Sequence, residues 1–481
     1  MAESVAGTLA PALRAGLKDI VGAKGWIEAP VEMSAYLTDW RGLATGNTPL
    51  VLRPATTTEV AAIVTLCQAQ AIPLVPQGGN TGMVAGSIPS ARGDQVLVNL
   101  GRLNRIRELD PLDYTVTVEA GCVLADLQAA AKAADRLFPL SLGAEGSCQI
   151  GGNLSTNAGG VMTLRYGNMR DLVLGLEVVL PDGRVWNGLR KLRKNNTGYD
   201  LKHLFIAAEG TLGIITAASL KLFPRPRQTA VALAAVPSPA ASVQLLARLR
   251  EQTGDTITAF ELMPRLAMEF GCKHLPNVTD PFAAAHPWYV LIDVGAGGHG
   301  LDLAGSLENA LAEGIEAGLI TDAVVAQNIA QSDQFWHLRE SLAEVQKAEG
   351  GSIRHDISVP VSQVPAFLDQ ATAAVMRLMP DARPMPFGHV GDGNIHFNIV
   401  KPLGMAATAF QARTREINEV VHDILLALGG SISAEHGIGA VRRDELARTA
   451  DPLELELMAS LKATLDPKGL MNPGKLLPPH D

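Results

Sequence analysis

The chain has 481 residues and a formal net charge of −9, with 47% apolar, 19% charged and 4% aromatic residues. This composition supplies enough apolar side chains for buried cores and excludes global disorder. The acidic balance and the scarcity of aromatic residues argue against a nucleic-acid-binding surface. Four well-separated cysteines without a CxxC motif argue against a disulfide framework or a zinc ribbon and indicate a reducing compartment; they are Cys67, Cys122, Cys148 and Cys272.

The sequence shows no pattern typical of a cleaved leader or a membrane span. The first residues include an acid, Glu3, and no continuous apolar run. A charge-free window at Gln228–Ala247 is interrupted by Pro237 and Pro239, which predict a strand followed by a helix. We therefore expect a cytoplasmic protein without a transmembrane segment.

The first glycine-rich loop, Pro76–Ser87, follows a predicted strand–helix–strand unit over residues 50–75. Gly78, Gly79 and Gly82 permit positive φ angles, so that backbone N–H groups can converge on an anion. No Gly-Lys-Ser/Thr follows, which excludes a Walker loop. The alternative is a flexible loop, but its position at the end of a β-α-β unit favours a phosphate site.

A second glycine-rich loop, residues 143–160, follows a helix predicted at Leu124–Leu137. Six of its eighteen residues are glycine, interleaved with small polar residues. Such a loop lets a flat or charged ligand approach the backbone closely. A third stretch, E-G-T-L-G-I-I-T at Glu209–Thr216, completes the region.

These three stretches resemble the FAD-binding domain of the vanillyl-alcohol oxidase/p-cresol methylhydroxylase (PCMH) superfamily over roughly residues 45–225. The resemblance implies that the first loop cradles the FAD pyrophosphate and that the other two line the ribityl chain and isoalloxazine. Some members attach the flavin to a histidine near the first loop, where this chain has Asn80, so non-covalent FAD is implied. The residues implied to bind FAD are Pro76, Gly78, Gly79, Asn80, Thr81, Gly82, Ser87, Gly143, Ser147, Cys148, Gly151, Gly152, Asn153, Ser155, Asn157, Gly159, Glu209, Gly210, Gly213, Ile215 and, near the C-terminus, Asn472.

A different dinucleotide signal lies at Gly295–Gly300, where G-A-G-G-H-G satisfies G-x-G-x-x-G. An apolar strand at Trp288–Val294 precedes it, a helix is predicted from Leu301, and Asp322 could bind a ribose. An NAD-dependent dehydrogenase is therefore an alternative. We rank it second, because a lone fingerprint is a frequent accident in a chain with 47 glycines, and favour a loop of a substrate-covering domain.

A helix predicted from Ser332 to Glu349 carries Arg339 next to Trp336, and an alternating strand follows at Ser352–Val359. An arginine on an amphipathic helix usually extends its charge to the surface. The functional alternative is a bidentate clamp for a substrate carboxylate.

The segment P-F-G-H-V-G-D-G-N-I-H-F-N, residues 386–398, is predicted to form a hairpin with Gly391–Asn394 as its loop. In that register His389 lies directly opposite His396, with Cβ atoms about 4.5–5.5 Å apart. Two imidazoles at this spacing can share a cation; the alternative is a pair of solvated or otherwise hydrogen-bonded histidines. Asn398 points to the same face as His396.

Glu435 and His436 are adjacent in a glycine-bounded loop, G-G-S-I-S-A-E-H-G-I-G, that follows a helix predicted at Phe410–Leu428. Glu435 is a candidate third metal ligand and His436 a candidate general base. Two histidines and one carboxylate leave an open coordination position, as in a catalytic metal site. A zinc hydrolase is the alternative from another class, although it leaves the glycine-rich loops unexplained.

Four motifs of the second half, W-H-L-R-E, the 386–398 segment, A-E-H-G-I-G and M-N-P-G-K-L-L-P, resemble the FAD-linked D-2-hydroxyacid dehydrogenases. This family includes D-lactate and D-2-hydroxyglutarate dehydrogenases and the flavin subunit of glycolate oxidase. The resemblance implies a zinc or manganese ion at His389, His396 and Glu435, a catalytic base at His436, and substrate contacts from Arg339, Arg354, Asn398 and His436.

Two positions depart from the D-2-hydroxyglutarate pattern, which has threonine where Ala343 stands and lysine where Arg354 stands. Arg354 keeps a cation for a distal carboxylate, whereas Ala343 loses a hydrogen bond. D-2-hydroxyglutarate is our lead substrate, with D-lactate or glycolate as alternatives.

The length suggests two or three domains. We expect an α+β fold, because the first half resembles a PCMH-type FAD-binding domain. The expected domains are an N-terminal helical segment (1–45), the FAD-binding domain (46–225), an α+β substrate or cap domain with the metal hairpin (226–425), and a C-terminal segment that returns to the flavin (426–481). Besides a small 2-hydroxyacid, the resemblance implies an electron acceptor, such as an electron-transfer flavoprotein or a quinone. We also allow for a homodimer.

Overall fold

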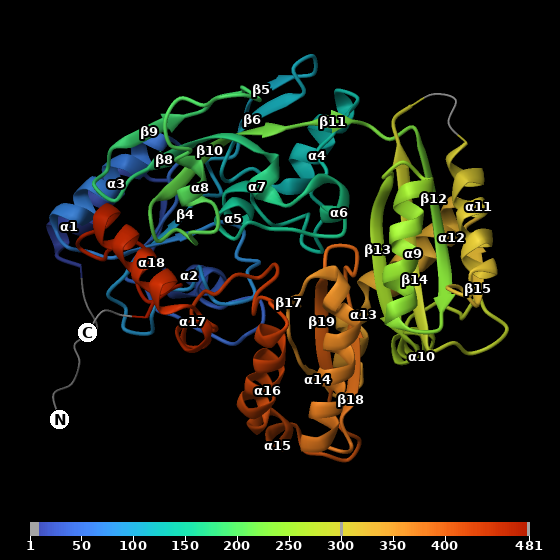
Figure 1. Cartoon of the computed structure of the whole chain (residues 1–481). Coiled ribbons are helices and arrows are strands. Elements are labelled where there is room, and N and C mark those ends of the chain that lie inside the picture. Colours follow the sequence, from blue (N-terminus) through green and yellow to red (C-terminus); the bar gives the residue numbers. More distant parts are fainter. Residues whose placement is uncertain (1–8, 299–301, 479–481) are drawn as a thin grey trace. The chain divides into compact units, whose positions relative to one another are not determined.

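The computed structural model describes residues 9–298 and 302–478 and divides into two compact units (Figure 1). Unit 1 contains residues up to Ala158, Asn168–Pro224 and the C-terminal residues from His436. Unit 2 contains Gly159–Gly167 and Arg225–Glu435. Unit 1 is therefore assembled from both ends of the chain. The predicted domain limits remain predictions.

The first sheet of unit 1 is built around parallel pairs. Its strands are, in spatial order, β1 (Trp26–Ile27), β2 (Val51–Leu52), β4 (Val96–Asn99) and β3 (Leu74–Gln77). Strand β4 is parallel to both β2 and β3. Helix α3 (Thr57–Ala69) connects β2 to β3 and begins after Thr56, whose side chain accepts a hydrogen bond from the Glu59 amide. Val60, Ile63 and Val64 of α3 pack into the core of this sheet.

The second sheet of unit 1 is antiparallel throughout. Its strands are, in order, β5 (Ile106–Asp110), β6 (Thr115–Glu119), β10 (Ile214–Lys221), β8 (Val173–Val179) and β9 (Val185–Gly188). A two-stranded ribbon joins β7 (Arg136–Leu137) to β11 (Phe223–Pro224). The helices of the unit, besides α3, are α1 (Pro11–Val21), α2 (Pro30–Leu37), α4 (Leu124–Ala133), α5 (Ile150–Ser155), α7 (Met169–Leu172), α8 (Lys202–Phe205), α17 (Arg443–Thr449) and α18 (Pro452–Leu465).

The first sheet of unit 2 is also antiparallel. Its strands are, in order, β13 (Ile257–Pro264), β14 (Trp288–Ala296), β12 (Gln228–Val236) and β15 (Asp322–Val325). One face packs on α10 (Arg265–His274), α12 (Ile329–Glu340) and α13 (Leu342–Ala348), in a core that contains Tyr289, Leu291 and Phe335. Figure 1 shows α9 (Pro239–Gln252) lying along this sheet, beside α11 (Leu303–Glu316).

The second sheet of unit 2 is centred on β19 (Asn394–Val400). It pairs with β16 (Ser352–Ile353), β17 (Ile357–Ser358) and β18 (Arg383–Phe387), all antiparallel. The other helical elements of unit 2 are α6 (Thr163–Tyr166), η1 (Val361–Gln363), α14 (Val364–Leu378), α15 (Ala407–Ala412) and α16 (Thr414–Ala427).

Three predicted elements are divided in the structure. The helix predicted at Ser332–Glu349 is two helices, α12 and α13, and the one at Phe410–Leu428 is α15 and α16. The strand at Ser352–Val359 is interrupted between β16 and β17. There, Nδ1 of buried His355 lies 2.6 Å from the Phe397 carbonyl oxygen. A side-chain hydrogen bond to β19 thus stands where backbone pairing between the strands is interrupted.

The predicted hairpin register at residues 386–398 is wrong. His396 lies opposite Phe387, not His389. Strand β18 leaves β19 after Phe387 because Gly388 (φ +154°) exchanges two backbone hydrogen bonds with Leu262 of β13. A Cβ at Gly388 would lie 2.5 Å from the Asn394 carbonyl oxygen, so this departure requires glycine.

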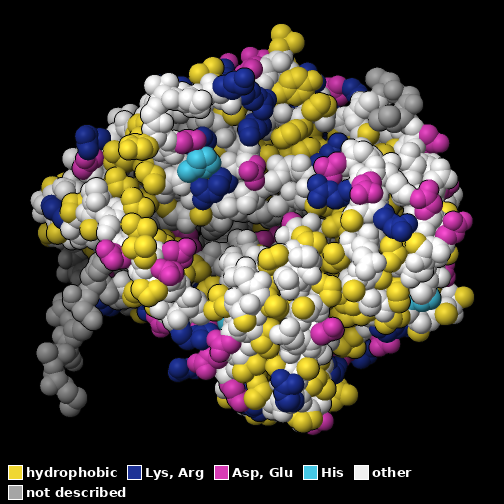
Figure 2. Space-filling view, viewed as in Figure 1, with side chains coloured by type: hydrophobic (Ala, Val, Ile, Leu, Met, Phe, Trp, Pro, Cys, Tyr) yellow, Lys and Arg dark blue, Asp and Glu magenta, His cyan; other side chains and the backbone are white. Residues whose placement is uncertain are grey.

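Within the described residues, no helix is long and apolar enough to cross a membrane. The charge-free window forms β12 and the first part of α9, as the prolines predict. On the face shown in Figure 2, acidic side chains lie among basic ones over much of the surface.

Candidate active site

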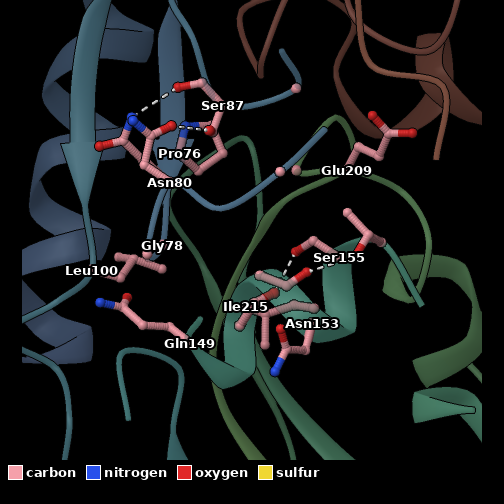
Figure 3. A pocket seen from close by; sticks show the side chains of 18 of the residues that line it. Pro76, Gly78, Asn80, Ser87, Leu100, Gln149, Asn153, Ser155, Glu209 and Ile215 are labelled. Carbon is pink, nitrogen blue, oxygen red and sulfur yellow. Dashed lines mark hydrogen bonds between the residues drawn. The ribbon is translucent and has the colours of Figure 1, made fainter. Parts of the chain in front are cut away.

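A cleft in unit 1 lies where the glycine-rich stretches meet (Figure 3). Its empty space, including the part open to solvent, is about 850 Å³. Backbone and small side chains form most of its wall. The lining residues are Pro76, Gln77, Gly78, Gly79, Asn80, Thr81, Gly82, Val84, Gly86, Ser87, Leu100, Gln149, Gly151, Gly152, Asn153, Ser155, Thr156, Glu209, Gly210, Gly213, Ile214, Ile215 and His436.

The residues of this cleft fit FAD. A Cβ built on Gly82 or Gly152 would meet no atom within 4 Å, so the backbone at both positions is open to a ligand. Gln149 carries a buried Oε1 without a hydrogen-bond partner among the described residues, as expected of a group that binds a ligand. Asn80 (φ 55°) and Glu209 (φ 50°) hold left-handed backbone conformations, which concentrate at ligand sites.

Fifteen of the predicted FAD residues line the cleft, and six do not. Ser147 and Cys148 pack behind the first loop, where a Cβ at Gly79 would lie 2.0 Å from the Ser147 carbonyl oxygen. Asn472 lies behind the wall and donates from Nδ2 to the carbonyls of Gly86 and Glu209. The other three are Gly143, Asn157 and Gly159, the last of which belongs to unit 2.

Glu209 braces the loop that carries His436. Its Oε1 accepts a hydrogen bond from the Ile438 amide at 2.8 Å, and its Oε2 accepts one from the Gly439 amide at 2.7 Å. Burial raises the pKa of Glu209, whereas the two amides and Lys475 favour its charged form. The predicted base His436 therefore lines this cleft, on a loop held by a buried carboxylate.

The three predicted metal ligands come together in unit 2. His389, His396 and Glu435 each offer one ligand atom, and these atoms all lie within 4.8 Å of one another. The imidazoles of His389 and His396 pack edge to face with centroids 5.5 Å apart. His389 Nε2 is 3.4 Å from Glu435 Oε1. The histidines thus meet although the predicted register is wrong.

Two more acids, buried Asp356 and half-buried Asp392, lie beside this cluster. Asp356 accepts the Glu435 amide at 3.0 Å and lies 3.9 Å from His396 Nδ1. Burial raises the pKa of Glu435 to about 8 and that of Asp392 to about 6. Imidazole and carboxylate donors suit zinc or manganese, and a cation would relieve the cost of burying these carboxylates. The residues present therefore fit a divalent metal.

The structure links two of the predicted substrate residues through Gln346, which the sequence analysis missed. Arg354 Nε donates to Ser352 Oγ at 3.3 Å, and Ser352 Oγ donates to Gln346 Oε1 at 2.7 Å. Asn398 Nδ2 donates to the same Gln346 oxygen at 3.1 Å. Asn398 Oδ1 and Gln346 Nε2 are buried without hydrogen-bond partners in the described chain. No motif signals Gln346, because it is an interior helix position.

Arg339 is not a surface residue. It is 6% exposed, and its Nε lies 2.8 Å from Glu261 Oε2. The sequence analysis missed Glu261, which lies on β13.

The G-x-G-x-x-G segment lacks the context of a dinucleotide-binding fold. Gly295 lies within β14, which is antiparallel to both of its neighbours, whereas that fold requires a parallel β-α-β unit. The Gly295 carbonyl accepts a hydrogen bond from Arg165. Residues 299–301, including the last glycine, lie outside the described residues.

Two protein-family models match the chain. The model described as "FAD binding domain" matches residues 48–188, and "FAD linked oxidases, C-terminal domain" matches residues 225–476. Together they support FAD as the cofactor, and neither the NAD nor the hydrolase alternative finds such support.

Curated relatives match nearly the whole chain. A mitochondrial D-2-hydroxyglutarate dehydrogenase of Arabidopsis thaliana is 38% identical over 461 residues, 96% of this chain and 80% of the relative. A D-2-hydroxyglutarate dehydrogenase of Xanthomonas citri pv. viticola is 39% identical over 452 residues, 94% of either chain. The solved structure of p-cresol methylhydroxylase with substrate bound superimposes with a TM-score of 0.74 at 15% identity, covering 97% of this chain and 96% of that one.

The predicted α+β fold with a PCMH-type FAD-binding domain is thereby confirmed. Identities near 38% over almost the full length establish the family as well. The chain belongs to the FAD-linked D-2-hydroxyacid dehydrogenases and is an FAD-dependent oxidoreductase of that family.

Proposed function

We propose that this enzyme oxidises D-2-hydroxyglutarate to its 2-oxoacid with non-covalent FAD and a divalent metal. One observation carries the proposal. His389, His396 and Glu435 gather their ligand atoms within 4.8 Å, and the residue after Glu435 is His436, which lines the flavin cleft. Consecutive Cα atoms lie about 3.8 Å apart, so the chain itself ties the candidate base to a candidate ligand.

The metal would be zinc or manganese, held by His389, His396 and Glu435. When bound, it would polarise the substrate hydroxyl as a Lewis acid. His389 presents Nε2 to the cluster, because its Nδ1 hydrogen bonds to Glu261 at 2.7 Å.

His436 acts as the general base and takes the proton of the substrate hydroxyl on a ring nitrogen. Imidazole is the side chain most often used for such a proton transfer near neutral pH. When bound, FAD would supply the acceptor for the hydride that leaves C2 of the substrate. Asn80 supports non-covalent binding, because it stands in the region where some members of the superfamily have the histidine that attaches the flavin. Its Nδ2 instead donates to the Thr38 carbonyl at 2.9 Å.

Arg354 is proposed to bind the distal carboxylate of the substrate. Its hydrogen bonds go to neutral oxygens, Ser352 Oγ and the Ala343 carbonyl at 3.0 Å. Burial lowers the pKa of Arg354, so an anion would stabilise its charge. Ala343, where the D-2-hydroxyglutarate pattern is expected to have threonine, contributes its backbone carbonyl to Arg354. Arg339 and Asn398 are proposed to contact the substrate, as the family resemblance implies, with Arg339 as a clamp for a carboxylate.

The lead substrate follows from the relatives, whose names specify D-2-hydroxyglutarate. D-lactate and glycolate are the alternatives within the family. The acceptor is proposed to be an electron-transfer flavoprotein or a quinone. A homodimer and a cytoplasmic location also stay predictions; the Arabidopsis relative is named as mitochondrial.

The test is anaerobic mixing of FAD-loaded protein with D-2-hydroxyglutarate, L-2-hydroxyglutarate, D-lactate and glycolate. We expect D-2-hydroxyglutarate to bleach the visible flavin absorption fastest. Removal of the metal with a chelator should abolish bleaching without releasing FAD, and zinc or manganese should restore it. His436→Ala should slow flavin reduction by about 10²–10⁴-fold, with a much smaller change in substrate affinity.

Each arm has an outcome that contradicts part of the proposal. Flavin that no D-2-hydroxyacid reduces would refute the activity. Full activity after complete metal removal would refute the metal, and faster reduction by D-lactate than by D-2-hydroxyglutarate would refute the lead substrate.

A further inference from the structure

Glu261 is a fully buried carboxylate shared by a candidate metal ligand and a candidate substrate residue. Its Oε1 lies 2.7 Å from His389 Nδ1. Its Oε2 lies 2.8 Å from Arg339 Nε and 2.6 Å from Arg339 Nη2. The side chain of Glu261 is 0% exposed, so water does not compete with these contacts.

The fold places Glu261 beside His389 through one short backbone pairing. Leu262 of β13 and Gly388 donate their amides to each other's carbonyls at 2.9 and 3.0 Å. Leu262 directly follows Glu261, and Gly388 directly precedes His389. The pairing of Leu262 with Gly388 therefore sets Glu261 next to His389. The two residues are 128 positions apart in the sequence, which is why no local motif reveals the contact.

On His389, the carboxylate determines which ring nitrogen carries the proton. A hydrogen bond from Nδ1–H to Glu261 Oε1 leaves the lone pair of Nε2 free, and Nε2 is the atom 3.4 Å from Glu435 Oε1. Partners of this kind orient metal-binding histidines and increase their basicity.

On Arg339, the carboxylate occupies one edge of the guanidinium. The centroid of the Phe387 ring lies 4.9 Å from Arg339 Cζ, so this ring packs against one face of the guanidinium. Because a guanidinium has five N–H donors in a rigid fork, the donors not used by Glu261 are held in a defined direction.

From this geometry we infer that Glu261 is a positioning residue that sets the metal-binding tautomer of His389 and the direction of Arg339 together. The inference rests on the proposed metal site. It goes further in assigning one carboxylate to both halves of substrate binding: the metal and the arginine.

The experiment compares Glu261→Gln with Glu349→Gln in FAD-loaded protein. Glu349 is a matched control, since it is 6% exposed at its side chain and binds two cations, with Oε1 at 2.6 Å from Lys273 and Oε2 at 2.7 Å from Arg383. Zinc affinity is measured by competition with a chelating dye, and melting temperature is measured in EDTA and in zinc.

We expect Glu261→Gln to weaken zinc binding by about 10- to 100-fold and to reduce the zinc-induced rise in melting temperature. Loss of Arg339 orientation should also raise KM for the hydroxyacid after saturation with zinc. Glu349→Gln should lower the melting temperature in EDTA with zinc affinity unchanged. Glu261→Asp, which keeps the charge with a shorter reach, should bind zinc more tightly than Glu261→Gln.

The outcomes separate the two proposals. A wild-type protein that binds neither zinc nor manganese would refute the metal site itself. Wild-type zinc binding together with equal affinity in Glu261→Gln would overturn only the positioning role. If Glu261→Gln does not fold, Glu261→Asp decides: zinc affinity equal to wild type, with KM unchanged, would overturn the inference.

Discussion

The flavin cleft of unit 1 and the histidine cluster of unit 2 are built by opposite means. The cleft is lined by backbone and small side chains from a few continuous loops. The cluster consists of polar side chains from the β18–β19 turn, β19 and the loop before His436, and Glu261 of β13 supports it from far away in the sequence. A backbone-lined cleft is sensitive to added atoms, whereas a side-chain cluster is sensitive to lost ones.

The largest expected effect is at Gly152, where the cleft wall is backbone alone. Gly152 lies in α5, and a Cβ there would meet no protein atom within 4 Å. Gly152→Val should therefore fold but place its side chain in the space that FAD requires. We expect purification without bound flavin and no reconstitution by added FAD, measured by visible absorption.

Gly146→Val is the matched control. A Cβ at Gly146 also meets no atom within 4 Å, and this exposed residue does not line the cleft. It should bind FAD as the wild type does. Normal FAD content in Gly152→Val would show that the cleft is not the flavin site.

The same contrast explains what could be read from the sequence. The glycine loops are continuous, so most of the predicted FAD residues line the cleft. The three candidate metal ligands also come together in the structure, and the sequence could suggest the two histidines because His389 and His396 lie seven residues apart. The hairpin register was missed because Gly388 bonds to Leu262 of another sheet, a contact with no local signal.

The partners that support the cluster were missed for the same reason. Glu261 and Gln346 are buried polar residues within ordinary strand and helix patterns. Such residues bury a polar group only because a distant side chain pairs with it. Glu261 pairs with His389 across 128 residues, and Gln346 pairs with Asn398 across 52; neither separation is a spacing that a single sequence can reveal.

A smaller effect is expected from Glu209→Gln. This variant tests whether the Glu209 carboxylate holds the loop that carries His436. Glutamine has a single acceptor oxygen, so one of the two amides, of Ile438 or Gly439, would face an NH₂ group. The loop of His436 should relax, and a displaced base slows reaction by about 10- to 100-fold. The measurement is the rate of flavin reduction at saturating substrate, with FAD affinity little changed.

Glu177→Gln controls for the loss of a buried carboxylate in unit 1. Glu177 is as buried as Glu209, at 7% exposure, and accepts hydrogen bonds from Thr57 and Thr216. This variant should be less stable but should reduce flavin at the wild-type rate. Equal losses of FAD affinity and rate in Glu209→Gln would instead identify Glu209 as a direct FAD ligand.

The smallest effect concerns a second acid of unit 2, half-buried Asp293, whose partners differ from those of Glu261. Burial raises the pKa of Glu261, but His389 and Arg339 lower it to about 2. Asp293 has neutral donors, Thr258 Oγ1 at 2.9 Å and Trp336 Nε1 at 3.2 Å. Burial therefore raises the pKa of Asp293 from 3.8 to about 6.

A raised pKa means that the folded state binds this proton more tightly than the unfolded state does. The contribution to stability is present below pH 3.8 and is lost as pH rises to about 6. At about 1.4 kcal/mol for each pH unit, the loss reaches at most about 3 kcal/mol. Asp293→Asn removes the titration, so its free energy of unfolding relative to wild type should rise across this window and stay constant above it.

The pH dependence of this difference, not its absolute value, is the test, because asparagine also alters the hydrogen bond to Thr258 or Trp336. Chemical denaturation of both proteins at several pH values measures it. Trp336→Phe removes one donor to the Asp293 carboxylate and should extend the decline of wild-type stability to higher pH. A constant difference between Asp293→Asn and wild type would mean that Asp293 is as ionised in the fold as in water. In that case neutral hydrogen-bond donors would not leave the pKa of Asp293 raised, and the proposed difference in pKa between Asp293 and Glu261 would be refuted.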